Sequence, residues 1–459
     1  MEMKRDIGII GLGTMGQNLC INMLSKDLSV AAWDIEADET QRLAQTLKND
    51  ALTACASLDE LLQKVERPRK LILLINAGDP VDEVIAQCLG ALSRGDVVID
   101  AGNSHYKDSQ RRHQLLQNKD IEFVGLGVSG GAEGARLGPS LMFGGSSTAW
   151  KICEESLRTI AANSVYGSCL SNFGEGGAGH FVKMVHNGIE YAEMQLIAEA
   201  YDIMCRGFGM DVTEQTSAFD RFNKGPLNSF LTDLTVKILN SDSVEIAEIV
   251  DSAGQKGTGR WVVEAGLDLG VPIPTLSASV EARLLSALLE RRDKLSQRIN
   301  SDRKILKPLP IEDIERALIF GKVSAFIQGI DLVQAAKENH QWSLNLLDIP
   351  RTWRQGCILR SVFLDRWIEG TEGEETKSLI DVRYFWEQLI DCELSIRSVL
   401  SACTEARIPV PALSASVSWY DSLTSSRLPQ SLTQAQRDAF GAHGLYLRND
   451  PTLLVHKEW

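Results

Sequence analysis

Ile7-Gly8-Ile9-Ile10-Gly11-Leu12-Gly13-Thr14-Met15-Gly16 determines the architecture of the first part of the chain. The first four residues are an apolar run typical of a buried strand, and a helical pattern follows through Leu19, Ile21 and Leu24. Glycines between a strand and a helix let the backbone approach a pyrophosphate, which binds at the helix N-terminus. The motif alone is weak, and a chance glycine turn is the alternative, but this position predicts a dinucleotide site. The residues predicted to bind it are Gly11, Gly13, Thr14, Met15 and Gly16.

Short apolar runs continue this pattern. We predict strands at 29–33, 71–75, 97–100 and 121–124, separated by helical segments. Such alternation indicates a Rossmann-type, doubly wound α/β sheet. After about Gly177 long helical patterns dominate to about residue 430. The chain is therefore divided into a dinucleotide-binding domain (1–177), an all-helical substrate and dimerisation domain (178–433) and a C-terminal tail (434–459) that reaches a partner subunit.

The second predicted strand ends at Asp34, about 20 residues beyond the glycines, where a carboxylate holds the ribose hydroxyls of a dinucleotide. Ile35 and Glu36 follow, so no arginine stands there to receive a 2′-phosphate, and a second carboxylate would repel it. The sequence therefore favours NAD over NADP.

Polar and glycine-rich segments follow the later strands: 76–78, 102–104 and 128–131. The side chains of Asn103 and Ser129 can hydrogen-bond a ligand, while glycines expose backbone N–H groups to a carboxylate. Ordinary turn chemistry is the alternative for each segment. We predict that Asn76, Ala77 and Asn103 contact the cofactor.

The stretch 179–191 predicts a helix whose polar residues share one face. These residues recur at i, i+3, i+4, i+7 and i+8, and the remaining positions are largely apolar. A helix apolar around most of its circumference is buried, so a narrow polar stripe faces an internal cleft. The alternative is a solvated face. The stripe offers groups for proton transfer and for orienting an oxygen-rich substrate, namely Lys183, His186, Asn187, Glu190 and Tyr191.

The helical region is internally duplicated. Residues 188–190 recur at 329–331, residues 222–225 at 353–356, and residues 271–280 at 408–417, in the same order. The second copy has Ser324 and Ile327 where the first has Lys183 and His186. Only the first copy can perform this chemistry.

Two further stretches suit an anionic ligand or a partner. Residues 252–261 are predicted to form a flexible loop carrying Lys256 and Thr258, with a mobile surface loop as the alternative. Residues 434–443 are expected to lie beyond the last helix, in a tail that crosses onto a partner subunit.

Composition narrows the function classes. The net charge of −14 argues against a nucleic-acid surface, which needs a basic stripe. The nine cysteines form no C-x-x-C pair, which gives no sign of a metal site and fits free thiols in a reducing compartment. The sequence shows no signal peptide or membrane span, so a cytoplasmic protein is expected.

With these motifs assembled, the sequence resembles decarboxylating 6-phosphogluconate dehydrogenases of the pentose phosphate pathway over essentially its whole length. The matching segments are 128–131, 183–191, 255–258 and 437–443. The resemblance implies oxidation and decarboxylation of 6-phospho-D-gluconate to D-ribulose 5-phosphate and CO2, with hydride transfer to NAD(P)+ and no metal. It also implies a homodimer with a shared active site.

The resemblance implies roles for matching residues. Lys183 acts as general base and Glu190 later protonates C1 of the enediol, with His186 and Asn187 beside them. The sugar acid is held by Asn103, Ser129, Gly130, Gly131, His186 and Asn187. The phosphate is bound by Tyr191, Lys256, Thr258, Arg283 and, from the neighbouring subunit, Arg437, with His443 beside them.

This chain departs from the family on the cofactor side. Asp34-Ile35-Glu36 stands where the family commonly has Asn-Arg-Thr, which strengthens the NAD interpretation. Two alternatives stay open: a related 3-hydroxyacid dehydrogenase acting on another 6-anionic gluconate, such as 6-sulfogluconate, and a non-catalytic paralogue that only binds the nucleotide or sugar acid.

Overall fold

The protein is described by a computed structural model that covers residues 4–255, 257–299, 309–371 and 376–459. It divides into two compact units, Met1–Ser416 and Val417–Trp459. The first unit holds the sheet and the long helices, and the second holds the C-terminal segment.

The first unit begins with an eight-stranded sheet in the order β10-β7-β6-β5-β4-β1-β2-β3. The pairs are parallel except that of β7 with β6. Its strands are β1 (Ile7–Ile10), β2 (Val30–Trp33), β3 (Leu52–Ala54), β4 (Lys70–Leu73), β5 (Val97–Asp100), β6 (Glu122–Ser129), β7 (Ser140–Gly144) and β10 (Leu170–Asn172). Chain order reverses at β1, which lies between β2 and β4. The prediction of a Rossmann-type sheet is confirmed, and ligands bind such sheets where the strand order reverses.

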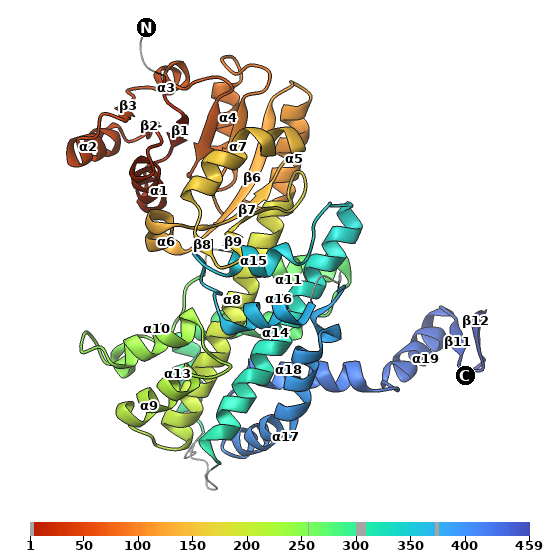
Figure 1. The fold of residues 1–459 in the computed structure, drawn as a ribbon. Helices are drawn as coiled ribbons and strands as arrows, with labels where there is room; N and C mark the ends of the chain where they lie inside the picture. Colours follow the sequence, from red (N-terminus) through yellow and green to blue (C-terminus); the bar gives the residue numbers. More distant parts are fainter. Residues whose placement is uncertain (1–3, 256, 300–308, 372–375) are drawn as a thin grey trace. The chain divides into compact units, whose positions relative to one another are not determined.

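Helices cover both faces of this sheet (Figure 1). They are α1 (Thr14–Ser25), α2 (Ala37–Leu47), α3 (Leu58–Lys64), α4 (Asp79–Cys88), α5 (Tyr106–Gln117), α6 (Gly131–Leu137) and α7 (Ser147–Ile160). Alternation along β1 separates two cores. Ile7 and Ile9 belong to the core that includes Met23 of α1, whereas Ile10 belongs to the core that includes Leu61 of α3. The apolar run of β1 is therefore used on both faces.

Strand β6 is longer than the sequence predicted, because two glycines give its second half a low strand propensity. Gly125 and Gly127 are poor strand residues by propensity. They are required because helix α8 (Ala178–Asp202) packs directly on the sheet. A Cβ at Gly127 would lie 2.5 Å from the Cβ of Lys183, and one at Gly179 of α8 would lie 2.3 Å from the carbonyl oxygen of Gly125. The prediction that the strand stops at residue 124 is wrong, and β3, β7 and β10 were also not predicted.

The helical part is built around α8 and α14 (Ile311–His340), which run antiparallel: Gly329 packs against Ile189, and Gly321 against Leu196. By length and composition α14 could cross a membrane, although 89% of its most apolar window is buried inside the protein. Its apolar surface is therefore used in packing. The other helices are α9 (Val212–Phe222), α10 (Phe230–Leu239), α11 (Thr258–Leu269), α12 (Pro274–Ser286), α13 (Leu289–Ser296), α15 (Asp348–Trp353), α16 (Val362–Thr371), α17 (Arg383–Glu405) and α18 (Pro411–Thr424).

The duplicated sequence forms matching elements. Both α12 and α18 begin at the proline of the repeat, Pro274 and Pro411. Each helix N-terminus is capped from a long helix: the amide of Thr275 donates to Gln328 (2.9 Å), and that of Ala412 donates to Glu199 (2.8 Å). Buried side chains here satisfy amides that a helix N-terminus leaves without partners.

The second unit contains helix α19 (Gln430–Gly441) and an antiparallel hairpin of β11 (Leu445–Leu447) and β12 (Asp450–Val455). Residues 434–441 therefore belong to a helix, and the prediction that this stretch lies beyond the last helix is wrong. The sequence did not predict this helix because it has no apolar stripe that packs in a core. Asp438 is its one buried residue.

Candidate functional site

The polar stripe lies on α8, within the part of that helix that packs on β6. Lys183, His186 and Tyr191 are buried, while Asn187 and Glu190 are half-buried. The helix reaches the sheet because Gly179 permits backbone contact with β6 and β7. The stripe is thereby held against the residue at the carboxyl end of β6, Ser129.

Lys183, Ser129 and His186 form a connected cluster. The amine of Lys183 donates to the hydroxyl of Ser129 (3.0 Å), and lies 3.3 Å from Nδ1 of His186. The hydroxyl of Ser129 lies 3.2 Å from Nε2 of the same imidazole, whose ring meets the indole of Trp353 edge-on at 5.1 Å. The cluster fixes the direction of the amine.

Glu190 reaches the same imidazole from the next turn of α8. Its Oε2 lies 3.7 Å from Nδ1 of His186, and the amide oxygen of Asn187 lies 3.4 Å from that nitrogen. Lys183 and Glu190 therefore both face His186, rather than opposite sides of the helix.

Burial shifts the protonation of these groups toward their neutral forms. Desolvation lowers the pKa of Lys183, and the nearby Glu190 carboxylate opposes that shift. Desolvation raises the pKa of Glu190, with Lys183 and Arg283 opposing. Burial and the charge of Lys183 hold the pKa of His186 well below its usual value. A neutral amine can accept a proton, and a protonated carboxyl group can donate one.

A second group of predicted residues lies one turn farther along α8. The guanidinium of Arg283, on α12, stacks 3.6 Å from the ring centroid of Tyr191. Thr258 is the buried first residue of α11, so the predicted loop ends at Gly257 and not at residue 261. The α11 N-terminus approaches Tyr191 closely, since a Cβ at Gly259 would lie 2.8 Å from that ring. Lys256 lies outside the described residues.

The predicted nucleotide residues gather at the carboxyl edge of the sheet. A Cβ at Gly11 would lie 2.5 Å from Leu74 O, and one at Gly16 would lie 2.0 Å from Gly11 O, whereas no atom lies within 4 Å of one at Gly13. The loop is thus tightly folded on its inner side and open at Gly13. Thr14 is exposed and Met15 half-buried. These features fit a pyrophosphate at the N-terminus of α1.

Asp34 lies beside this loop at the end of β2. Its carboxylate accepts the amides of Leu12 and Glu36, so it joins the glycine loop to the following turn. Each carboxylate oxygen keeps a further lone pair for a hydroxyl group. Ile35 is 83% exposed, which leaves room beside Asp34.

The remaining predicted residues fall into three places. Asn76 and Ala77 follow β4, and Asn103 follows β5; all three are exposed. Gly130 and Gly131 follow Ser129, and the backbone at Gly130 touches Gly356: a Cβ would lie 2.5 Å from its carbonyl oxygen. Arg437 and His443 are exposed residues of the second unit.

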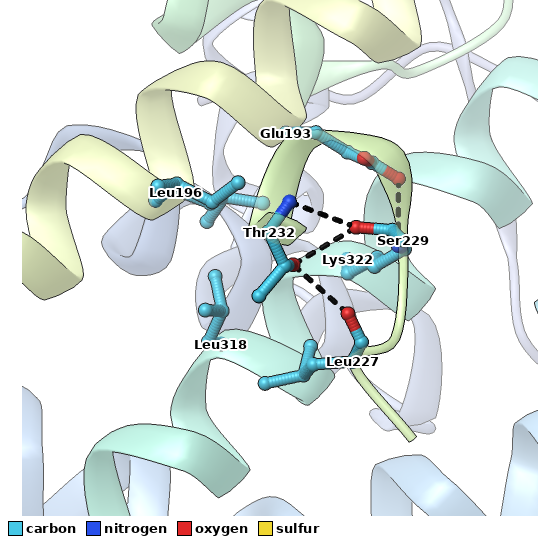
Figure 2. A pocket seen from close by; sticks show the side chains of 8 residues that line it. Glu193, Leu196, Leu227, Ser229, Thr232, Leu318 and Lys322 are labelled. Carbon is cyan, nitrogen blue, oxygen red and sulfur yellow. Dashed lines mark hydrogen bonds and ion pairs between the residues drawn. The ribbon is translucent and has the colours of Figure 1, made fainter. Parts of the chain in front are cut away.

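A buried ion pair behind the stripe was not predicted. Glu193 of α8 and Lys322 of α14 lie 3.1 Å apart, with side chains 2% and 3% exposed. Figure 2 shows them beside a small cavity, together with Ser229 and Thr232, whose hydroxyls lie 2.9 Å apart. The available signal was a charged residue, Lys322, within the otherwise uncharged run 317–330.

The described residues contain no group of three or more His, Cys, Asp or Glu side chains placed to hold a metal ion. All nine cysteines are free thiols, and eight of them are buried.

Known proteins share this arrangement of domains. The sequence model of the 6-phosphogluconate dehydrogenase C-terminal domain matches residues 179–459, and that of the NAD binding domain of 6-phosphogluconate dehydrogenase matches residues 6–168. The chain is 42% identical over 452 residues to 6-phosphogluconate dehydrogenase, decarboxylating 1, of Saccharomyces cerevisiae, covering 96% of this chain and 92% of the yeast protein.

Two further relatives extend over nearly the full length. The chain is 39% identical over 468 residues to the Bacillus subtilis 6-phosphogluconate dehydrogenase named NADP(+)-dependent and decarboxylating, covering 99% of each. The structure of Plasmodium falciparum 6-phosphogluconate dehydrogenase, known in apo form and in complex with NADP+ and with 6-phosphogluconate, matches with a TM-score of 0.94 at 37% identity, covering 99% of this chain and 100% of that one. The resemblance drawn from the motifs is confirmed: the chain belongs to the decarboxylating 6-phosphogluconate dehydrogenase family.

Proposed function

We propose that the protein catalyses the oxidative decarboxylation of 6-phospho-D-gluconate to D-ribulose 5-phosphate and CO2, with NAD as the preferred coenzyme. One observation carries the proposal: a buried amine and a half-buried carboxyl group meet at one imidazole on α8, beside the carboxyl end of the sheet. A non-catalytic binding protein would not need burial that favours a neutral Lys183.

Lys183 is the general base. Its amine accepts the proton of the substrate C3 hydroxyl, while Ser129 and His186 hold it in place. Gly13, Asp34, Asn76 and Asn103 would hold the dinucleotide, whose nicotinamide would supply the acceptor for the hydride of C3. The product is a 3-keto acid whose ketone lies β to the C1 carboxylate, so CO2 leaves with the electron pair taken up by the ketone.

Lys183 and Glu190 carry out the proton transfers that follow. Protonated Lys183 donates to the ketone oxygen as the enediol forms. Glu190, whose pKa is raised by burial, protonates C1 of the enediol while the neutral Lys183 amine takes back the proton of the C2 hydroxyl, which gives the ketopentose and leaves Glu190 ionised. Asn187 and the amides of Gly130 and Gly131 bind the sugar acid.

The phosphate is bound at the far end of the stripe. Arg283 stacks on Tyr191, and Gly259, which follows Thr258, lies close to the same ring; Lys256 precedes Thr258 by two residues in the sequence. Arg437 and His443 complete the phosphate site from a second subunit, so the active form is a homodimer. Exposed apolar side chains support such an interface, among them Leu284, Leu285 and Leu288, which are 51%, 58% and 43% exposed.

The NAD preference rests on Asp34. Its carboxylate suits two ribose hydroxyls, and neither Ile35 nor Glu36 offers a cation to a 2′-phosphate. The Bacillus subtilis relative is NADP(+)-dependent by name, so the proposal implies that the two proteins differ in coenzyme. The free thiols support a reducing, cytoplasmic location.

The test is a spectrophotometric assay of pure protein with 6-phosphogluconate and either NAD or NADP, together with CO2 release. We expect turnover with both coenzymes and a higher kcat/KM with NAD. Turnover of 6-sulfogluconate without turnover of 6-phosphogluconate would identify the sulfonated acid as the substrate. No turnover of either acid would contradict catalysis.

A further inference from the structure

The C-terminal unit is organised around one buried carboxylate. Asp438 of α19 is fully buried, although both of its neighbours in the helix are exposed. Its Oδ1 accepts the amide of Gly444 (2.9 Å) and Nδ1 of His456 (2.8 Å). Its Oδ2 accepts the amide of Lys457 (3.0 Å) and the indole N–H of Trp459 (3.0 Å). Four donors from two later segments thus converge on a single side chain.

These bonds connect the two residues assigned to the phosphate. Arg437 precedes Asp438, and His443 precedes Gly444. Gln434 adds a second connection, because its Oε1 accepts from Arg437 (3.0 Å) and its Nε2 donates to the carbonyl oxygen of Gly444. The separation of Arg437 from His443 is therefore set by the bond from Asp438 to the Gly444 amide and by Gln434, which bonds both the Arg437 guanidinium and the Gly444 carbonyl group.

The turn between them is also closely packed. Gly444 has a φ of +74°, and a Cβ there would lie 2.8 Å from the side chain of Leu454 on β12. The His443 ring meets Phe440 edge-on at 5.9 Å, and a Cβ at Gly441 would lie 2.7 Å from its Nε2. The imidazole is held against the end of α19 while staying exposed.

The four hydrogen-bond donors hold the pKa of the Asp438 carboxyl group well below its usual range, and the contact from His456 is the largest cause. The carboxylate therefore remains ionised wherever the unit is folded near neutral pH. Charge-assisted hydrogen bonds are stronger than neutral ones, which suits a side chain that must hold four groups.

We propose that Asp438 is a positioning residue for phosphate recognition: it fastens residues 456–459 to α19 and so holds Arg437 and His443 in one arrangement. The inference rests on the proposed function, since the role of Arg437 and His443 in phosphate binding belongs to it. Asp438 itself needs no contact with the substrate.

The experiment compares four full-length proteins: the wild type, Asp438→Asn, Trp459→Phe and Asp450→Asn. Asparagine keeps the shape of Asp438 but loses the charge and one acceptor oxygen. Phenylalanine removes only the indole donor. Asp450 is the matched control, an exposed aspartate of the same unit whose carboxylate accepts from the amide and the hydroxyl of Thr452.

We expect Asp438→Asn to raise KM for 6-phosphogluconate by about tenfold, equal to about 1.4 kcal/mol of binding, with kcat and KM for the coenzyme within about twofold. Trp459→Phe should raise KM in the same direction by less, and Asp450→Asn should leave it unchanged. A fall in kcat with unchanged KM, or equal effects at Asp438 and Asp450, would overturn the positioning role.

Should Asp438→Asn fail to fold, Trp459→Phe decides the question. An unchanged KM in that folded variant would overturn the proposal, and a raised KM would support it. The proposed function fails separately, because it predicts turnover of 6-phosphogluconate by the wild type.

Discussion

Replacing Lys322 by methionine tests how the buried pair behind the catalytic stripe is stabilised. Lys322 and Glu193 lie 3.1 Å apart at 3% and 2% exposure, and the ammonium also lies 4.9 Å from the ring centroid of Phe363. The cavity beside them offers about 10 Å³ to a water molecule, which is close to the minimum for one water. The lost ammonium therefore cannot be replaced by bulk solvent.

The expected loss is large. Removing one partner of a buried ion pair leaves an uncompensated charge and costs about 3–5 kcal/mol. Burial already raises the pKa of Glu193, and Lys322 opposes that shift, so the carboxyl group should become protonated in the variant. Protonation would reduce the loss at low pH. The variant's stability should thus fall as pH rises through the folded-state pKa of Glu193.

The assay is urea unfolding at one fixed protein concentration, with Lys237→Met as the matched control. Lys237 pairs with Asp233 at 2.7 Å, but its side chain is 70% exposed, so its loss should cost under about 1 kcal/mol. In a double-mutant cycle, Lys322→Met and Glu193→Gln should be coupled by roughly 0.5–3 kcal/mol. Equal losses for Lys322→Met and Lys237→Met, with no pH dependence, would refute the reasoning.

The remaining predictions concern catalysis. Lys183→Met should lower kcat by about 10²–10⁴-fold while substrate binding stays measurable, and unchanged turnover would exclude it as the base. In Glu190→Gln the acidic arm of the hydride-transfer pH profile should move to lower pH, since the Glu190 carboxylate raises the pKa of Lys183 and the neutral amine is the reactive form; a burst experiment that shows no movement would contradict their coupling. Asp34→Gly with Ile35→Arg should shift preference toward NADP by roughly 10–100-fold, equal to the about 1.5–3 kcal/mol of a charge-assisted hydrogen bond. Ending the chain at Thr433 should abolish turnover, and a fully active monomer would refute the shared site.

Local patterns predicted much of the site because its residues are close in sequence. Lys183, His186 and Glu190 lie on one helix, where spacing alone places them on a common face. Gly11 to Gly16 lie between one strand and one helix, where Gly11 and Gly16 each have a steric reason. Such arrangements depend on neighbouring residues and elements, and periodicity reports them directly.

The missed features depend on contacts between distant segments. The second half of β6 looks unlike a strand because Gly125 and Gly127 make room for α8, more than 50 residues later. In the sequence Lys322 interrupts an apolar helix, and only the structure shows that it pairs with Glu193. Propensity and periodicity carry no information about either partner.

The amino-acid sequence alone predicted strands β1, β2, β4 and β5 and the start of β6, the glycine loop, the acidic residue after β2 and the polar face of the helix 178–202. These follow from backbone sterics and from the periods of strand and helix, which act over a few residues. Tertiary structure alone decided the burial of Lys183, its contact with Ser129, and the closure of residues 444–459 onto Asp438. Desolvation and hydrogen bonding depend on which distant segments exclude water from a group, and that is settled only when the chain has packed.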